Sequence, residues 1–371
     1  KNLFGASIIL SMALFPYIYL LLRVKLASVG LDLFRAAKSL GNNNTASIFK
    51  VIIPSLFPVI VAGMTLVVFE TIADFGGVST LRIETFTVGI YNAWFGYQSY
   101  FSAARLAGYL LVFVFIIIFI AKFYEGKQNT LAQKTSEVFE GIKLVPYKSF
   151  LATLYCSTIF TIVFLIPLGQ LLIWSYAENN FLSIENIHLV FNSLALGVIV
   201  SMITVFFGIA LALAYRNDKK LRLIISVSTS GYAIPGSVIS AGLLVSIGYF
   251  FGISITSFGI VGLVLCLSLR FMTPAYNYLS ASLVNIKDTS EKALSTYSKD
   301  SMRAFKYFYL PHMKSATYLG LMIVFIESVK EQPATLLLRP VGFDTLSTKI
   351  YNFTSARTSL VVLHLNCVPN I

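Results

Sequence analysis

Long apolar runs separated by short polar segments make up almost the whole chain. A helix needs about twenty apolar residues to cross the hydrocarbon core of a bilayer. Eight runs reach or approach this length: residues 2–22, 55–76, 104–122, 151–174, 193–214, 223–250, 256–279 and 308–330. The pattern therefore predicts an all-α polytopic membrane protein with about eight transmembrane helices.

The composition agrees with this prediction. The 371 residues are 57% hydrophobic and only 12% charged, with a mean hydropathy of +0.79. Soluble domains carry about twice that charged fraction. The lipid bilayer is therefore the expected surrounding of most of the chain.

The net charge of +12 could suggest a nucleic-acid partner, but the placement of the basic residues indicates another reason. Twenty Lys and Arg residues lie in the polar segments on one side of the predicted spans, in the ranges 23–50, 122–150, 216–222 and 287–314. The segments on the other side hold one, Arg82. Cytoplasmic loops carry such an excess. The bias therefore assigns the basic segments to the cytoplasm, and no nucleic-acid partner is expected.

A polar, helix-forming insert, Arg35–Pro54, separates the first two runs and reads RAAKSLGNNNTASIFKVIIP. Ala36 and Ala37 give it a small helical surface, and Gly41 is suited to the left-handed position that follows a helix. The asparagines behind Gly41 can cap a new helix. Pro54 lies near the start of the next run, where its missing N–H costs little.

A second copy of this insert, Lys292–Pro311, follows at a constant offset of 257 residues. Equivalent positions include Ala36/Ala293, Pro54/Pro311, Gly63/Gly320, Val67/Val324, Glu70/Glu327, Asp74/Glu331 and Arg82/Arg339. After an insertion of three residues, four more positions agree: Thr85/Thr345, Ile90/Ile350, Tyr91/Tyr351 and Asn92/Asn352. Chance pairing of apolar segments would not place Pro, Gly and Glu at one offset, so we infer an internal duplication.

The spacing Ala-Ala-(three residues)-Gly, with Pro thirteen positions later, resembles the cytoplasmic coupling motif of ABC importer permeases, Glu-Ala-Ala…Gly…Ile-x-Leu-Pro. Arg35 stands where that family carries glutamate. The resemblance implies a type I importer permease fold with two homologous halves, docked on a cytoplasmic ABC ATPase dimer. The coupling residues that it implies are Arg35, Ala36, Ala37, Gly41 and Pro54 in the first copy, and Lys292, Ala293, Leu294, Ser298 and Pro311 in the second. The second copy lacks the second Ala and the Gly, so we expect it to dock less typically.

Several further segments resemble the ferric-iron branch of permeases whose two halves are fused: residues 70–79, 85–96, 231–238, 330–340 and 343–346. The resemblance implies a multi-pass subunit of the bacterial inner membrane, without a cofactor, that receives ferric ion from a periplasmic binding protein. Thiamine, a polyamine or an oxyanion is an alternative cargo within the same class. A secondary transporter would also contain repeats, but it has no need of paired coupling helices.

A hydrophilic connector, residues 126–150, separates the two copies of the repeat. We expect residues 1–125 to be the C-terminal part of a first permease half. Residues 151–371 are then the second half, with its last helix missing or altered. Since the first copy retains fewer preceding spans than the second, we expect a fragment trimmed at both ends.

Four carboxylates in or beside the predicted spans form two pairs, Glu70/Asp74 and Glu327/Glu331. Each pair is spaced i, i+4, so both carboxylates fall on one helical face. Carboxylates within a membrane segment suggest a function, and hard oxygen ligands suit a hard cation. We therefore expect these four side chains to line the translocation path.

Arg270 lies within an apolar run, where its permanent charge requires a carboxylate or backbone carbonyls as partner. We expect an intramembrane ion pair. Pairing with Arg270 or Lys330 is also the structural alternative for the carboxylates. Pro235 and Gly236 interrupt the run 223–250, either as a kink or as an opening of the helix.

The sequence shows no constellation of catalytic or metal-binding residues. His188, His312 and His364 are scattered, the three cysteines form no CxxC pair, and no G-x-x-x-x-G-K-[ST] phosphate loop occurs. An intramembrane enzyme would need His, Asp or Ser residues at catalytic spacing. We therefore expect a transport subunit, with ATP hydrolysis carried out by a separate ATPase.

Overall fold

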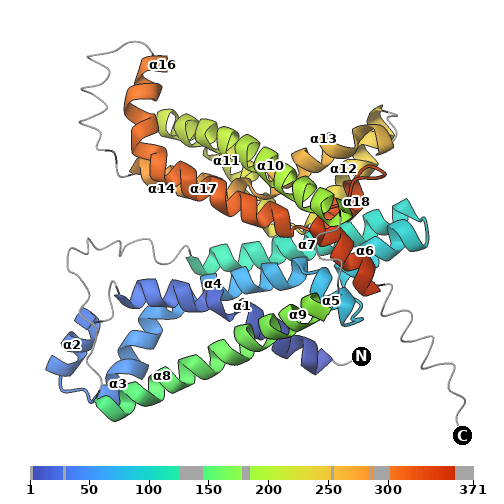
Figure 1. Cartoon of the computed structure of the whole chain (residues 1–371). Helices are drawn as coiled ribbons and strands as arrows, with labels where there is room; N and C mark the ends of the chain where they lie inside the picture. Colours follow the sequence, from blue (N-terminus) through green and yellow to red (C-terminus); the bar gives the residue numbers. More distant parts are fainter. Residues whose placement is uncertain are drawn as a thin grey trace, which may run out of the picture. The chain divides into compact units, whose positions relative to one another are not determined.

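The computed structural model describes residues 3–27, 31–125, 145–177, 184–251, 255–284, 286 and 301–355. Every regular element in these ranges is helical (Figure 1). The prediction of an all-α protein is confirmed for the described chain.

The part before residue 126 contains α1 (Leu3–Lys25), α2 (Leu31–Ser39), α3 (Asn44–Ser47), α4 (Ile53–Ala73), α5 (Gly76–Thr80), α6 (Phe86–Tyr91) and α7 (Tyr100–Glu125). Two π-helical turns, η2 (Ile48–Ile52) and η3 (Asn92–Gly96), interrupt this series.

The later part contains α8 (Pro146–Phe160), α9 (Ile166–Ala177), α10 (Ile184–Asn217), α11 (Arg222–Ser228), α12 (Gly236–Phe251), α13 (Ile255–Arg270), α14 (Met272–Val284), α16 (Ser301–Ala304), α17 (Leu310–Lys330) and α18 (Pro333–Leu338). The short turns are η4 (Thr161–Leu165), η5 (Lys219–Leu221), η6 (Gly231–Ala233) and η7 (Phe305–Tyr309). A further helix covers residues 346–355.

Five helices of the described chain are long and apolar enough to cross a membrane: Leu3–Lys25, Asn44–Ala73, Tyr100–Ala121, Pro146–Tyr176 and Asn186–Arg216. Two bent pairs raise the number to seven if each counts as one span: Arg222–Ala233 with Gly236–Gly248, and Gly259–Arg270 with Met272–Val284. These correspond to seven of the eight predicted runs. The eighth, α17, is outside this set, and Lys314, Glu327 and Lys330 make it less apolar.

The turn inside the first insert is a Schellman motif. The N–H of Asn42 donates to the carbonyl of Ala37 at 3.2 Å, and the N–H of Gly41 donates to the carbonyl of Lys38 at 2.9 Å. Gly41 has φ 85°, in the left-handed region that glycine occupies without steric cost. Asn43 then caps α3, because its Oδ1 accepts from the N–H of Ala46 at 2.7 Å. The predicted glycine stop and asparagine cap are both confirmed.

The predicted duplication reappears in the boundaries of the helices. The elements α3, η2 and α4 are followed, at an offset of 257 residues for every boundary, by α16, η7 and α17. In both copies the π-helical turn ends two residues before the proline, Pro54 or Pro311. A π-turn changes the hydrogen-bonding register of the helix where proline removes a donor. The two copies therefore share the same local distortion as well as the same sequence pattern.

The chain packs as two compact units. One comprises residues 72–114 and the described residues from 184 onward, and the other comprises residues 2–71 and 115–183. In the first unit, α10, α14 and α17 pack side by side (Figure 1) around the fully buried Leu279, Met313 and Val324. The helices α12, α13 and α18 continue this core.

The second unit leaves most of its apolar side chains exposed, as expected of helices that face lipid. Its buried Gly63 lies against α1, where an added Cβ would come within 3.2 Å of Cγ1 of Ile18. Small residues permit such close helix crossings in membranes. The predicted boundary at 126–150 falls largely outside the described residues and stays a prediction.

Candidate functional site

The residues predicted to couple the first copy to an ATPase lie on α2 and between α2 and the start of α4. Arg35 and Ala36 are exposed, whereas Ala37 is only 3% exposed. The two alanines therefore differ, since Ala36 presents its methyl group outward and Ala37 packs within the chain. Pro54 is exposed.

In the second copy, the structure describes Pro311, which is exposed like Pro54. The other predicted coupling residues of this copy lie outside the described residues: Lys292, Ala293, Leu294 and Ser298.

Three helix breaks in the first unit bring polar groups into an apolar interior. The chain turns by 115° between Arg222–Ala233 and Gly236–Gly248, and by 47° between Gly259–Arg270 and Met272–Val284. A third break separates α17 from α18 at Glu331 and Gln332. The 115° turn at Pro235 is an opening of the helix and far exceeds a proline kink.

The three breaks meet at a buried ion pair. Nη1 of Arg270 lies 3.0 Å from Oε1 of Glu331, and the two side chains are 8% and 6% exposed. The N–H of Ala334 also points to this carboxylate oxygen, at 3.5 Å. A Cβ added to Gly236 would come within 2.2 Å of the same oxygen and 2.5 Å of Arg270 Nη1. Only glycine leaves room for the ion pair at this position.

The ion pair expected for Arg270 is thus present, with Glu331 as partner. In α17, Glu327 pairs with Lys330 at 2.8 Å, and the Lys330 side chain is half-exposed. Both carboxylates of the second copy therefore have the basic partners that the sequence suggested as a structural alternative. A role for either in the path stays a prediction.

In the first copy, Glu70 and Asp74 are half-buried. Oδ2 of Asp74 accepts from the N–H of Val78 at 2.9 Å, at the start of α5. Among the described residues, no three His, Cys, Asp or Glu side chains gather in a group that could hold a metal ion. A path-lining role for Glu70 and Asp74 likewise stays a prediction.

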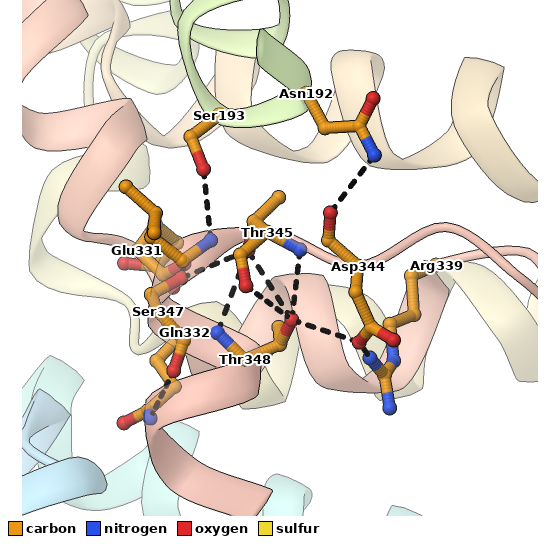
Figure 2. A network of polar contacts seen from close by, with 10 residues as sticks. Asn192, Ser193, Glu331, Gln332, Arg339, Asp344, Thr345, Ser347 and Thr348 are labelled. Carbon is orange, nitrogen blue, oxygen red and sulfur yellow. Dashed lines mark hydrogen bonds and ion pairs between the residues drawn. The ribbon is translucent and has the colours of Figure 1, made fainter. Parts of the chain in front are cut away.

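Equivalent hydrogen bonds hold the loop after each acidic residue. Oγ1 of Thr87 donates to the carbonyl of Asp74 at 2.8 Å. In the second copy, Oγ of Ser347 donates to the carbonyl of Glu331 at 3.0 Å (Figure 2). Each of these hydroxyls also contacts a threonine two residues earlier, at 2.9 Å in the first copy and 3.1 Å in the second. The structure thus extends the repeat to side-chain contacts.

One predicted equivalence needs correction. Arg82 aligns with Arg339 by residue type. The backbone conformation shows instead that Arg82 is equivalent to Gly342, because these two residues have φ angles of 56° and 84° at the same point of each turn. The inserted residues therefore precede the turn rather than follow it. Arg339 instead forms an ion pair with Asp344 (Figure 2).

Two polar residues that the sequence reasoning missed fasten the loop of the second copy to α10. Oγ of Ser193 accepts from the N–H of Leu346 at 2.8 Å, and Nδ2 of Asn192 donates to the carbonyl of Asp344 at 3.0 Å (Figure 2). The signal available was a pair of adjacent polar residues at the end of an apolar run.

Arg216 was also missed as an individual residue. Its guanidinium donates to the carbonyls of Leu283 and, at 2.9 Å, Ile286. The Leu283 carbonyl lies in the last turn of α14 and also accepts from the N–H of Ile286 at 3.1 Å. A cation at a helix C-terminus is favourable. Arg216 thus joins the end of α10 to the end of α14.

Residues 2–137 match the family described as binding-protein-dependent transport system inner membrane component. This range contains the complete first copy of the repeat, with its Schellman turn and the α3–η2–α4 helix. Residues 2–137 belong to this permease family. The second copy repeats the same elements within the permease, which is an all-α membrane transport subunit rather than an enzyme.

The permease is also similar along nearly its whole length to two proteins of Haemophilus influenzae. It is 27% identical over 365 residues to the Fe(3+)-transport system permease protein FbpB 2, covering 95% of this chain and 71% of the relative. It is 22% identical over 390 residues to the putative ferric transport system permease protein FbpB 1, covering 98% of this chain and 60% of the relative. The chain thus spans only part of the length of either relative.

Proposed function

We propose that this permease carries ferric iron across the bacterial inner membrane as part of an ATP-driven importer. The observation that carries the proposal is the similarity, over 95% of the chain, to a relative named for Fe(3+) transport. A periplasmic binding protein delivers the ion, and a cytoplasmic ABC ATPase dimer supplies the energy. The permease itself alternates between two states that open the path to one side at a time.

The two inserts act as the coupling elements of this cycle. The exposed Ala36 and the short helix α2 form a small surface of the kind that fits a cleft of an ATPase subunit. The second insert docks on the other ATPase subunit. When the ATPases close on ATP, the two halves rock and the path changes sides.

The carboxylates Glu70, Asp74 and Glu327 line the path in this account. Their oxygens are hard ligands that suit a trivalent cation. Glu331 belongs to the same acidic set, but its ion pair with Arg270 gives it a positioning role at the helix breaks.

Iron uptake tests the cargo. Membrane vesicles that contain the permease, its ATPase and its binding protein should accumulate radiolabelled ferric iron with ATP, and should not accumulate thiamine or a polyamine. Glu70→Gln and Glu327→Gln should each lower iron uptake about tenfold, because each removes a charged oxygen ligand from the path. Accumulation of thiamine or a polyamine in place of iron would contradict the cargo, and unchanged iron uptake by both variants would remove these carboxylates from the path.

A further inference from the structure

Two equivalent tyrosines of the repeat touch each other. Tyr91 ends α6 and Tyr351 lies in the helix 346–355, and the two positions correspond after the three-residue insertion. Their ring centroids are 5.6 Å apart with an interplanar angle of 81°. In an arrangement with two-fold symmetry, a residue contacts its own equivalent only at the axis. The Tyr91–Tyr351 contact therefore lies where a two-fold axis that relates residues 75–92 to residues 332–352 would pass.

Other side chains close the space around the pair. Phe75 is 1% exposed, and its ring centroid lies 5.2 Å from that of Tyr91 and 5.0 Å from that of Tyr351. Phe95 contacts Tyr91 at 5.0 Å. Three rings thus pack mutually at the axis, with a fourth against one of them.

The loops behind the rings also contact each other. Gln332 is the equivalent of Phe75 in the second copy, and its side chain contacts Gly76 of the first copy. A Cβ added to Gly76 would come within 2.3 Å of Oε1 of Gln332. Nε2 of Gln332 donates to the carbonyl of Ser347 at 2.8 Å. The Gln332 side chain therefore lies against Gly76 of the first copy while its amide is hydrogen-bonded within its own copy.

The ring cluster carries no negative charge that would bind a ferric ion. Burial raises the pKa of Tyr91 to about 12, and the neighbouring Tyr351 adds to this shift. Burial also raises the pKa of Tyr351. Both phenols are therefore neutral at physiological pH, and a neutral aromatic constriction blocks ions by excluding water.

The positive-inside bias assigns these loops to the side opposite the basic segments. We propose that Tyr91, Tyr351 and Phe75 form the outer closure of the translocation path, a contact that separates whenever the path opens to that side. The inference rests on the proposed function, because it assumes alternating access. Tyr91 and Tyr351 come from opposite copies of the repeat, so movement of the copies away from each other on this side separates the two rings.

Reversible crosslinking tests the closure in the complete transporter with its ATPase and binding protein. Cys156, Cys266 and Cys367 are first replaced by alanine, and Tyr91→Cys is combined with Tyr351→Cys. A short bifunctional thiol reagent should link the pair in the nucleotide-free state and stop transport, and reduction should restore it. Trapping the ATPases with ATP and vanadate should lower the crosslinking yield about tenfold through the shift in population.

A matched control combines Tyr91→Cys with Phe353→Cys. Phe353 lies two residues from Tyr351 in the same helix but is 61% exposed, so this pair should neither link efficiently nor stop transport. Absence of a crosslink in the axial pair, a yield unaffected by trapping, or full transport by the linked protein would overturn the proposal. Loss of transport in the cysteine-free parent would instead count against the proposed function.

A second variant does not depend on crosslinking. Tyr351→Ala removes one ring from the axis and weakens the closed state. ATP hydrolysis without the binding protein should then rise severalfold, because less energy is needed to leave that state. Hydrolysis equal to that of the parent would contradict the closure even if the double-cysteine protein fails to assemble.

Discussion

At the scale of single residues, the buried ion pair between Arg270 and Glu331 joins two of the helix breaks in the first unit. Removing two charges from water is costly, and the cost is recovered only with close geometry and further hydrogen bonds. Oε1 of Glu331 meets this condition, since it faces Nη1 of Arg270 at 3.0 Å and the N–H of Ala334 at 3.5 Å. Loss of one partner leaves the other charge buried and uncompensated.

Glu331→Gln should therefore lower the free energy of unfolding by about 3 kcal/mol. Thermal unfolding of the permease in detergent measures the change. Glu327→Gln is the matched control, because the same substitution four residues earlier, in α17, removes a pair whose Lys330 side chain is 48% exposed. The control should cost less than about 1 kcal/mol. Similar unfolding curves for the two variants would show that the buried pair contributes little.

At the scale of helices, the conformation of the first insert, Arg35–Pro54, depends on the turn at Gly41. The nine residues of α2 are too few to persist as an isolated helix. The Schellman hydrogen bonds and the Asn43 cap join α2 to α3 and stabilise both. Gly41 is the residue whose conformation this arrangement requires.

Gly41→Ala should destabilise the turn by about 1 kcal/mol, because alanine is strained at φ 85° even though its methyl group meets open space. Hydrogen exchange of the α2 amides should become faster. Gly108→Ala in the interior of α7 also meets open space, without a left-handed backbone, and should leave exchange in α7 unchanged or slower. Unchanged exchange in α2 of the Gly41 variant would mean that the turn does not hold the element.

The same elements show how far sequence reasoning reaches. The roles of Gly41 and Asn43 could be predicted from the sequence because turn chemistry is local. The offset of 257 could be predicted because a duplication preserves spacing. The sequence offered a pairing of Arg270 with one of the carboxylates only as an alternative. It did not predict that Gly236 lies beside this pair, because their meeting depends on how three broken helices pack over long sequence distances. The pairing of Arg82 with Arg339 was wrong because residue identity was followed, whereas the backbone repeats a left-handed residue at Gly342.

At the scale of the whole molecule, the duplication is the organising feature. Each copy contains a π-helical turn before a proline, a long helix and a loop held by a hydroxyl-to-carbonyl bond. The copies differ in the partners of their equivalent acidic residues. Asp74 accepts from the N–H of Val78, whereas Glu331 pairs with Arg270. One end of the repeat is proposed to bind the ATPase, and the other is proposed to close the path at the axis.

The central claim is that docking of an ATPase at these stretches drives transport, and Ala36→Trp tests it most directly. Ala36 is exposed, so a large side chain should fit without refolding but should clash with a docked ATPase. Ala13→Trp, at an exposed position of the membrane helix α1, is the control. We predict ATP-dependent ferric iron accumulation in vesicles with the parent and Ala13→Trp, and its loss with Ala36→Trp at equal protein amount and equal thermal stability. Transport by Ala36→Trp at the parent rate would contradict the account.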